Sequence, residues 1–155
     1  MYARTIPPVT PATVVRKVMV WPVATVDGDA TLAEVAEALA ADEVGALCVT
    51  EDGRLAGIIS ERDVVVHLAA GADPAHLTAA EAMSNDLVTA SPDDSVLDAA
   101  RRMEEAQVRH LPVIDNGRIA GIVSMRDLFA VLANEVYDPA VVFVRSGTKV
   151  MVIDE

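Results

Sequence analysis

The chain has 155 residues, of which 52% are hydrophobic and 23% are charged. This composition is enough for one or two packed cores, so it excludes a disulfide-stapled miniprotein and a wholly disordered chain. Lys and Arg total 12 while Asp and Glu total 24, which gives a net charge of −12. Such an acidic surface repels phosphate backbones and argues against non-specific nucleic-acid binding, although a local pocket can still hold one small phosphorylated ligand.

Targeting and redox features favour a cytoplasmic location. The longest stretch without Asp, Glu, Lys or Arg covers residues 5–15 and contains three prolines, which is much shorter than the roughly 20 apolar residues of a membrane span. No basic segment followed by an apolar run marks a secretory signal. The single cysteine, Cys48, has no second cysteine to pair with and is expected to be a small buried core residue. We therefore expect a reduced, cytoplasmic environment and no membrane association.

An internal repeat organises the chain. Aligned with itself at an offset of 64 residues, the chain has 17 identities among the 51 ungapped pairs between residues 19–69 and 83–133. The strongest block reads Asp-Gly-Arg-Leu-Ala-Gly-Ile-Ile-Ser-Glu-Arg-Asp in residues 52–63 and Asn-Gly-Arg-Ile-Ala-Gly-Ile-Val-Ser-Met-Arg-Asp in residues 116–127. Two tandem copies of one supersecondary unit follow from this pattern.

Each copy predicts the order β-α-β-β-α. In the first copy we expect a strand at residues 23–26, a helix with the apolar face Leu32, Val35, Ala36 and Leu39, strands at residues 46–50 and 55–59, and a helix from Ser60. The second copy repeats this with a strand at residues 87–90, the helix face Val96, Ala99, Ala100 and Met103, strands at residues 110–114 and 119–123, and a helix from Ser124. Capping-box spacing opens the first helix of each copy, at Thr31 with Glu34 and at Ser95 with Asp98. The dipeptides Asp52-Gly53 and Asn116-Gly117 predict two-residue hairpin turns.

The fold class predicted is α+β, with repeats at residues 15–72 and 79–136 packed as a pseudo-two-fold pair. One copy alone has a thin core, so the two are expected to cover each other. The connector at residues 71–80 ends in a further capping box, Thr78 with Glu81, and predicts an ordered link with a short helix. The tail at residues 138–155 has Val-rich segments at 140–145 and 149–153 around Ser146-Gly147-Thr148, which predicts a β-hairpin. We expect this hairpin to extend a sheet of the same chain, with crossing to a partner subunit as the alternative.

The block Gly-Ile-Ile-Ser-x-Arg-Asp, closing a β-α-β-β-α repeat of this length, resembles the CBS domain (cystathionine-β-synthase domain). The tandem pair resembles a Bateman module, and the likeness covers roughly residues 15–136. It implies a stand-alone CBS-pair protein without a catalytic domain.

The Ser–Asp pairs at the start of the last helix of each repeat are the first candidate site. Ser60 with Asp63, and Ser124 with Asp127, have the spacing of a capping box, and that structural role is sufficient by itself. The resemblance implies a second role, in which the aspartate holds the ribose of an adenosyl nucleotide while the helix N-terminus favours its phosphate.

The stretch that enters the second strand differs between the repeats. It reads Val-Gly-Ala at residues 44–46 and Val-Arg-His at residues 108–110. The resemblance implies that contacts from one repeat meet the aspartate of the other. The main nucleotide-binding cleft is then expected to contain Ile58, Ser60, Arg62, Asp63, Leu87, Val108, Arg109 and His110. The second cleft is expected to contain Val23, Val44, Gly45, Ala46, Ile122, Ser124, Arg126 and Asp127.

These sets predict unequal clefts, with the cleft of Arg109 and Asp63 preferring the charged ligand. The alternative is that Arg109 pairs with a neighbouring acid such as Glu105, four residues before it. Arg62 and Arg126 are open to the same two interpretations, phosphate contact or a position along their own helices.

The function predicted is a non-catalytic regulatory sensor that binds AMP, ADP or ATP between the repeats and requires no cofactor. The scarcity of cationic groups favours a monophosphate or a modest affinity. His67, His76 and His110 do not have the spacing of a zinc site, and no catalytic arrangement is evident. We expect a homodimer through the helix faces of Val64, Val65 and Leu68 and of Leu128, Phe129 and Leu132, and a regulated protein that the sequence does not identify. The alternative function is a structural or interaction dimer, such as a stress-associated scaffold, with vestigial clefts.

Overall fold

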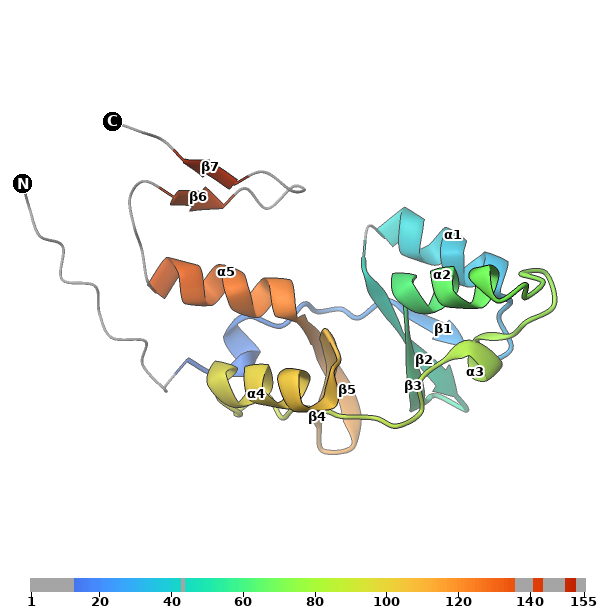
Figure 1. Cartoon of the computed structure of the whole chain (residues 1–155). Helices are drawn as coiled ribbons and strands as arrows, with labels where there is room; N and C mark the ends of the chain where they lie inside the picture. The colour runs from blue at the N-terminus through green and yellow to red at the C-terminus, as the bar shows by residue number, and fades with distance from the viewer. Residues whose placement is uncertain (1–12, 43, 136–140, 144–149, 153–155) are drawn as a thin grey trace, which may run out of the picture.

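A computed structural model describes residues 13–42, 44–135, 141–143 and 150–152. The two repeats lie side by side, each with a small sheet covered by helices (Figure 1). The first repeat contains β1 (Thr25–Asp27), α1 (Leu32–Asp42), β2 (Ala46–Glu51), β3 (Arg54–Ser60) and α2 (Glu61–Ala69). The second contains α4 (Val96–Ala106), β4 (His110–Asp115), β5 (Arg118–Ser124) and α5 (Met125–Glu135). The α+β class and the tandem repeats are therefore confirmed.

The first repeat has the three-stranded sheet that the sequence predicts, in the order β1-β2-β3. Strand β1 runs parallel to β2, and β2 runs antiparallel to β3. The hairpin between β2 and β3 turns at Asp52 and Gly53, whose φ angles are 51° and 74°. These positive values are the ones that a two-residue turn of this kind requires. The expected strand at residues 23–26 is shifted slightly along the chain, to Thr25–Asp27.

In the second repeat, the predicted strand at residues 87–90 is wrong. Only Ala90 pairs there, in a single parallel bridge to Val113, and the described sheet has two strands, β4 and β5. The residue that faces this segment explains the difference. In the first repeat the Cys48 N–H donates to the carbonyl of Ala24 at 3.2 Å, whereas the equivalent residue on β4 is Pro112, which has no N–H to donate.

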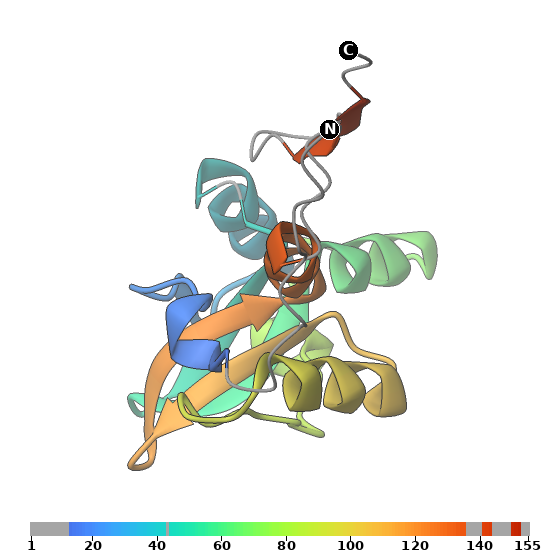
Figure 2. The same ribbon diagram turned by 90° about the vertical axis from the view of Figure 1, so that its left-hand side faces the viewer.

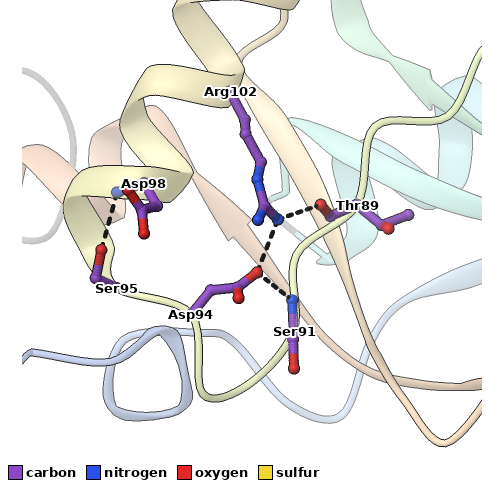
Figure 3. A network of polar contacts seen from close by, with 6 residues as sticks. All are labelled: Thr89, Ser91, Asp94, Ser95, Asp98 and Arg102. Carbon is purple, nitrogen blue, oxygen red and sulfur yellow. Dashed lines mark hydrogen bonds and ion pairs between the residues drawn. The ribbon is translucent and has the colours of Figure 1, made fainter.

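Side-chain contacts hold the segment that replaces this strand (Figure 3). The Arg102 guanidinium of α4 donates to the Thr89 carbonyl at 3.0 Å and to Asp94 Oδ2 at 2.7 Å. The same carboxylate oxygen accepts from the Ser91 N–H at 2.8 Å. The residue of the first repeat that corresponds to Arg102 is Ala38, so this clamp belongs to the second repeat alone.

The leading segment of each repeat packs on the other repeat. The 3-10 turn η1 (Val15–Lys17) places Val15 in the core of the second repeat, and Figure 2 shows this blue segment alongside β5. The connector helix α3 (Ala79–Ala82) buries its two terminal alanines in the core of the first repeat. Two antiparallel bridges complete the exchange, Val20 with Ile122 and Ser84 with Ile58. The two repeats therefore share their cores with each other's leading segments.

Two methionines anchor these exchanged segments against glycines of the central strands. Met19 lies over Gly121 on β5, and Met83 lies over Gly57 on β3. A side chain at either glycine would collide with the methionine, so the absence of a Cβ makes room for it. The expected ordered connector is also confirmed, because Thr78 and Glu81 form a complete capping box at the start of α3.

Two of the apolar residues expected on the helix surfaces belong instead to the cores. Val64 on α2 is 8% exposed and Leu128 on α5 is fully buried. Val65, Leu68 and Phe129 do lie on the surface, with 46% to 63% of each residue exposed. Leu132 lies outside the residues whose side chains are described.

The tail forms an antiparallel pair, β6 (Val141–Phe143) with β7 (Val150–Val152). Residues 146–148, the expected turn, lie outside the described residues. Among the described strands this pair is a sheet of its own, so the expectation that it extends another sheet of the chain is not met there. Within the described part of the chain, no helix has the length and apolar content needed to cross a membrane.

Candidate functional site

Both predicted Ser–Asp pairs cap their helices. At α2, Asp63 Oδ2 accepts from the Ser60 N–H at 2.8 Å and from its hydroxyl at 2.9 Å, and Ser60 Oγ lies 3.3 Å from the Asp63 N–H. At α5, Asp127 Oδ2 accepts from the Ser124 N–H at 3.0 Å, and Ser124 Oγ accepts from the Asp127 N–H at 3.0 Å. In each pair the described bonds use one carboxylate oxygen, which leaves the capacity of Oδ1 for a further donor.

The helix N-termini have fewer spare N–H groups than the sequence led us to expect. The Glu61 N–H donates to the Gly45 carbonyl at 3.0 Å, and the Met125 N–H donates to the Arg109 carbonyl at 2.8 Å. The third N–H of each helix is used by the cap. The N–H of the second residue, Arg62 or Arg126, has no partner among the described hydrogen bonds. An anion at either helix would therefore depend on one N–H and on nearby arginine side chains.

Strand pairing places the asymmetric stretches beside these caps. Ala46 lies opposite Ser60, and His110 lies opposite Ser124, at the same position of the two hairpins. Each strand therefore begins next to the cap of its own repeat. Residues 44–46 differ from residues 108–110, so the two caps have different side chains beside them although the backbone is the same.

The two strand starts meet across the repeats at Gly45 and His110. A Cβ built on Gly45 would lie 3.2 Å from His110 Nε2. The imidazole therefore occupies the space that a side chain at position 45 would need. Glu61 of α2 and Asp127 of α5 also lie close enough to act on this ring. His110 therefore lies against Gly45 of the opposite repeat and is influenced by the charge of Glu61, the first residue of α2.

Burial governs the protonation of His110. Loss of solvent lowers the pKa of the imidazole, and the carboxylates of Asp127 and Glu61 oppose this effect. The guanidinium groups of Arg109 and Arg126 add to the lowering. The charges of two acidic and two basic side chains, of which only Glu61 belongs to the first repeat, thus act on one half-buried imidazole.

Arg109 is exposed and takes part in no ion pair among the described residues. The alternative pair with Glu105 is thus not formed. Arg62 and Arg126 are likewise exposed, with no described ion pair. All three guanidinium groups are available to an anion that approaches the caps.

Ala46, an expected residue of the second cleft, is buried with 4% exposed, whereas the other expected apolar cleft residues are half-buried, which suits walls that a ligand can still reach. These residues are Val23, Val44, Ile58, Leu87, Val108 and Ile122. Sequence reasoning missed the partners of two of them, since Ser84 bridges Ile58 and Val20 bridges Ile122. No local signal predicts these bridges, because the partner segments belong to the opposite repeat.

Other chemistry has little basis in the described residues. They contain no group of three or more His, Cys, Asp or Glu side chains that could hold a metal ion. Cys48 is buried in β2, and burial raises the pKa of its thiol to about 11, which makes it a poor nucleophile. An open hollow of about 1060 Å³ lies between the two hairpin turns, at the opposite end of the strands from the caps.

Tandem α+β repeats that pack their leading segments on each other define a class of paired-repeat modules. The model of the CBS domain matches residues 15–70 and 79–134. Together these ranges make up more than half of the chain, which therefore belongs to the CBS-domain family.

Known relatives and solved structures agree with this assignment. The CBS domain-containing protein YhcV of Bacillus subtilis is 35% identical over 114 residues, which cover 74% of this chain and 81% of that protein. The CBS domain pair of protein MJ0100, solved in complex with 5′-methylthioadenosine and S-adenosyl-L-methionine, is 27% identical, with a TM-score of 0.75 over 81% of this chain and 99% of that one. Hypoxic Response Protein I, solved with two coordinated zinc ions, is 35% identical, with a TM-score of 0.68 over 76% of this chain and 98% of that one.

Proposed function

We propose that this CBS pair is a non-catalytic, regulatory protein of the cytoplasm that binds an adenosine-containing nucleotide between its repeats. The observation that carries the proposal is the contact of His110 with Gly45. Near this contact lie Glu61 of the first repeat and Asp127, Arg109 and Arg126 of the second repeat, whose charges act on the imidazole. The known complex of the MJ0100 pair with two adenosine-containing ligands supports this ligand class.

The chemistry of each cap suits a nucleotide. The free lone pairs on Asp63 Oδ1 can accept a hydroxyl of ribose, while Oδ2 remains in the cap. The Arg62 N–H and the guanidinium groups of Arg62 and Arg109 can hold phosphate. The proposed second cleft combines Asp127 with Arg126, Gly45 and Ala46, whereas the proposed main cleft combines Asp63 with Arg62, Arg109 and His110. We therefore propose that the main cleft prefers the more highly charged ligand, a monophosphate above all in a chain of net charge −12.

Regulation by such a ligand requires unequal affinity for two arrangements of the repeats. The contact of Gly45 and His110 and the exchanged leading segments are where such arrangements can differ. We also propose a homodimer, because the exposed faces of α2 and α5 carry Val65, Leu68 and Phe129. One structural relative, a CBS-CP12 protein, is hexameric, which supports association without specifying its form. The ligand-dependent target is a further protein.

Calorimetry and thermal unfolding with AMP, ADP and ATP test the proposal. A ligand at 100 times its Kd is expected to stabilise the fold by about 2.7 kcal/mol. Asp63→Asn retains an oxygen for the cap but removes the charge, and it is expected to reduce AMP binding severalfold. Asp127→Asn is the matched change in the equivalent cap, and because the Asp127 charge acts on His110 but lies outside the proposed main cleft, it is expected to reduce AMP binding less than Asp63→Asn does. Absence of both heat and thermal shift with all three nucleotides contradicts the proposal.

A second function, a structural or interaction dimer with vestigial clefts, has one observation in its favour. Ser60 and Asp63 form a complete capping box, and the equivalent cap of α5 is also formed, so each Ser–Asp pair has a structural role without any ligand. Unchanged association in light scattering, together with silent calorimetry, favours this function over the first.

A further inference from the structure

The chain contains a single tryptophan, Trp21, and 71% of it is exposed. It belongs to neither core cluster, and no hydrogen bond or ring contact is described for its indole. Burial of a large aromatic side chain is among the strongest contributions to packing. Here that contribution is absent, so the fold itself gives no reason for an indole at this position.

The backbone around Trp21 is held firmly on both sides. Immediately before it, the Val20 N–H donates to the Ile122 carbonyl at 2.8 Å, and the Ile122 N–H donates to the Val20 carbonyl at 3.1 Å. Three residues after it, the Ala24 carbonyl accepts from the Cys48 N–H at 3.2 Å. Trp21 therefore lies on a short crossing between β5 of the second repeat and β2 of the first.

This crossing joins the two walls of the second cleft that we proposed above. Ile122 belongs to one wall, and Ala46, two residues before Cys48 on β2, belongs to the other. Val23, a further expected cleft residue, lies on the crossing itself. Trp21 thus lies between residues that we proposed for the second cleft, on a backbone segment that is hydrogen-bonded to β5 and to β2.

The main cleft has no equivalent aromatic residue. Its own crossing begins at Ser84, which bridges Ile58 through hydrogen bonds of 3.0 Å and 2.9 Å, and the residue that corresponds to Trp21 is Asn85. The two proposed clefts therefore differ both in cationic groups and in aromatic groups. The main cleft has Arg109 and His110 and a polar rim, while the second cleft has Gly45 and Ala46 and an indole.

We infer that Trp21 stacks on the base of a ligand in the second cleft, and that this cleft takes a nucleoside with little or no phosphate. The inference rests on the proposed function and adds a specificity for one of its two clefts. Every nucleobase has a π-face on which an indole can stack, and such stacking does not depend on phosphate. Scarce cationic groups then matter little, because an uncharged nucleoside needs none.

Because Trp21 is the only tryptophan, its fluorescence reports on this cleft directly. Titration of the full chain with adenosine, excited at the red edge of the indole band, is expected to quench the fluorescence saturably. Asp127→Asn is expected to weaken this quenching severalfold. Asp63→Asn, the matched change in the other cap, is expected to leave it unchanged. Trp21→Leu is expected to weaken adenosine binding about tenfold in calorimetry, while Trp21→Phe keeps most of it.

The outcomes separate this inference from the proposed function. Nucleotide binding in calorimetry without any change in Trp21 fluorescence overturns the inference and leaves the proposed function standing. Quenching that Asp63→Asn abolishes and Asp127→Asn does not also overturns it, because the indole would then report on the main cleft. Silence of AMP, ADP, ATP and adenosine in both measurements removes the proposed function together with the inference. Trp21 is exposed, so its variants are expected to unfold at the wild-type temperature, which thermal unfolding checks.

Discussion

Gly57 and Gly121 occupy equivalent positions on β3 and β5, yet alanine should affect them differently. A Cβ at Gly57 would lie 2.8 Å from the Ser84 carbonyl oxygen as well as against the Met83 side chain. At Gly121 the near atoms all belong to the Met19 side chain, with Sδ at 2.7 Å and Cγ at 3.0 Å. A change of rotamer can move the Sδ and Cγ of Met19 away and leaves the milder contact with its Cβ at 3.1 Å, whereas a carbonyl held in a strand bridge cannot move without breaking that bridge.

The magnitudes follow from this contrast. Overpacking against fixed atoms costs about 1–3 kcal/mol, so Gly57→Ala is expected to lower the free energy of unfolding by that amount. Alanine in place of a strand glycine regains about 0.5–1 kcal/mol of backbone entropy, which should nearly offset a shift of Met19 in Gly121→Ala. At this chain length 1 kcal/mol corresponds to about 2–4 °C in Tm.

Urea and thermal unfolding, followed by far-UV circular dichroism, measure both variants. Adding Met83→Ala to Gly57→Ala should leave most of the loss in place, because the Ser84 carbonyl remains. Equal stabilities for Gly57→Ala and Gly121→Ala, or full rescue by Met83→Ala, would refute the reasoning that the Ser84 carbonyl limits the space at Gly57.

Three further predictions concern the thiol, the imidazole and the surface. Cys48 should react with a thiol reagent only as fast as the first repeat opens, and a ligand bound across the repeats should slow this further; rapid labelling of the native protein contradicts its burial. The lowered pKa of His110 means that the folded state binds its proton less readily than the unfolded chain does. The free energy of unfolding should therefore fall as the pH drops below the ordinary value of 6.5 and through the folded pKa, and His110→Gln should flatten that part of the stability profile; an unchanged profile counts against this assignment. Val65→Lys should convert the proposed dimer to monomer in light scattering, whereas Asp115→Lys near a hairpin turn should not, and dimers that persist in both variants place the interface elsewhere.

Local causes made most of the scaffold predictable. Hairpin turns need residues that tolerate positive φ, and Asp52-Gly53 and Asn116-Gly117 supply them within a few residues of chain. Capping boxes are similarly local, and the pair of Thr78 with Glu81 predicted a helix of only four residues. The lost strand of the second repeat also had a signal in Pro112, since a residue without an N–H cannot donate to a neighbouring strand.

Contacts between distant segments could not be predicted in this way. Periodicity assigns the apolar residues near Met19 and Met83 to cores but does not say that each enters the core of the opposite repeat. The contact between Gly45 and His110 is of the same kind. Its one sequence signal is the small residue at position 45 where the other repeat has Arg109, and that signal identifies a difference without identifying the ring that fills the space.

Duplication explains why the differences gather at the clefts. Some residues form the same local structure in both copies, such as the caps of α2 and α5. Each copy places the same requirement on them, so they remain equivalent. Residues that line a cleft face the opposite copy, where the two surroundings need not match. His110 contacts Gly45 of the second cleft and lies within reach of Glu61, the first residue of α2 beside the main cleft. This imidazole therefore lies where the two copies meet, between the two clefts that we proposed.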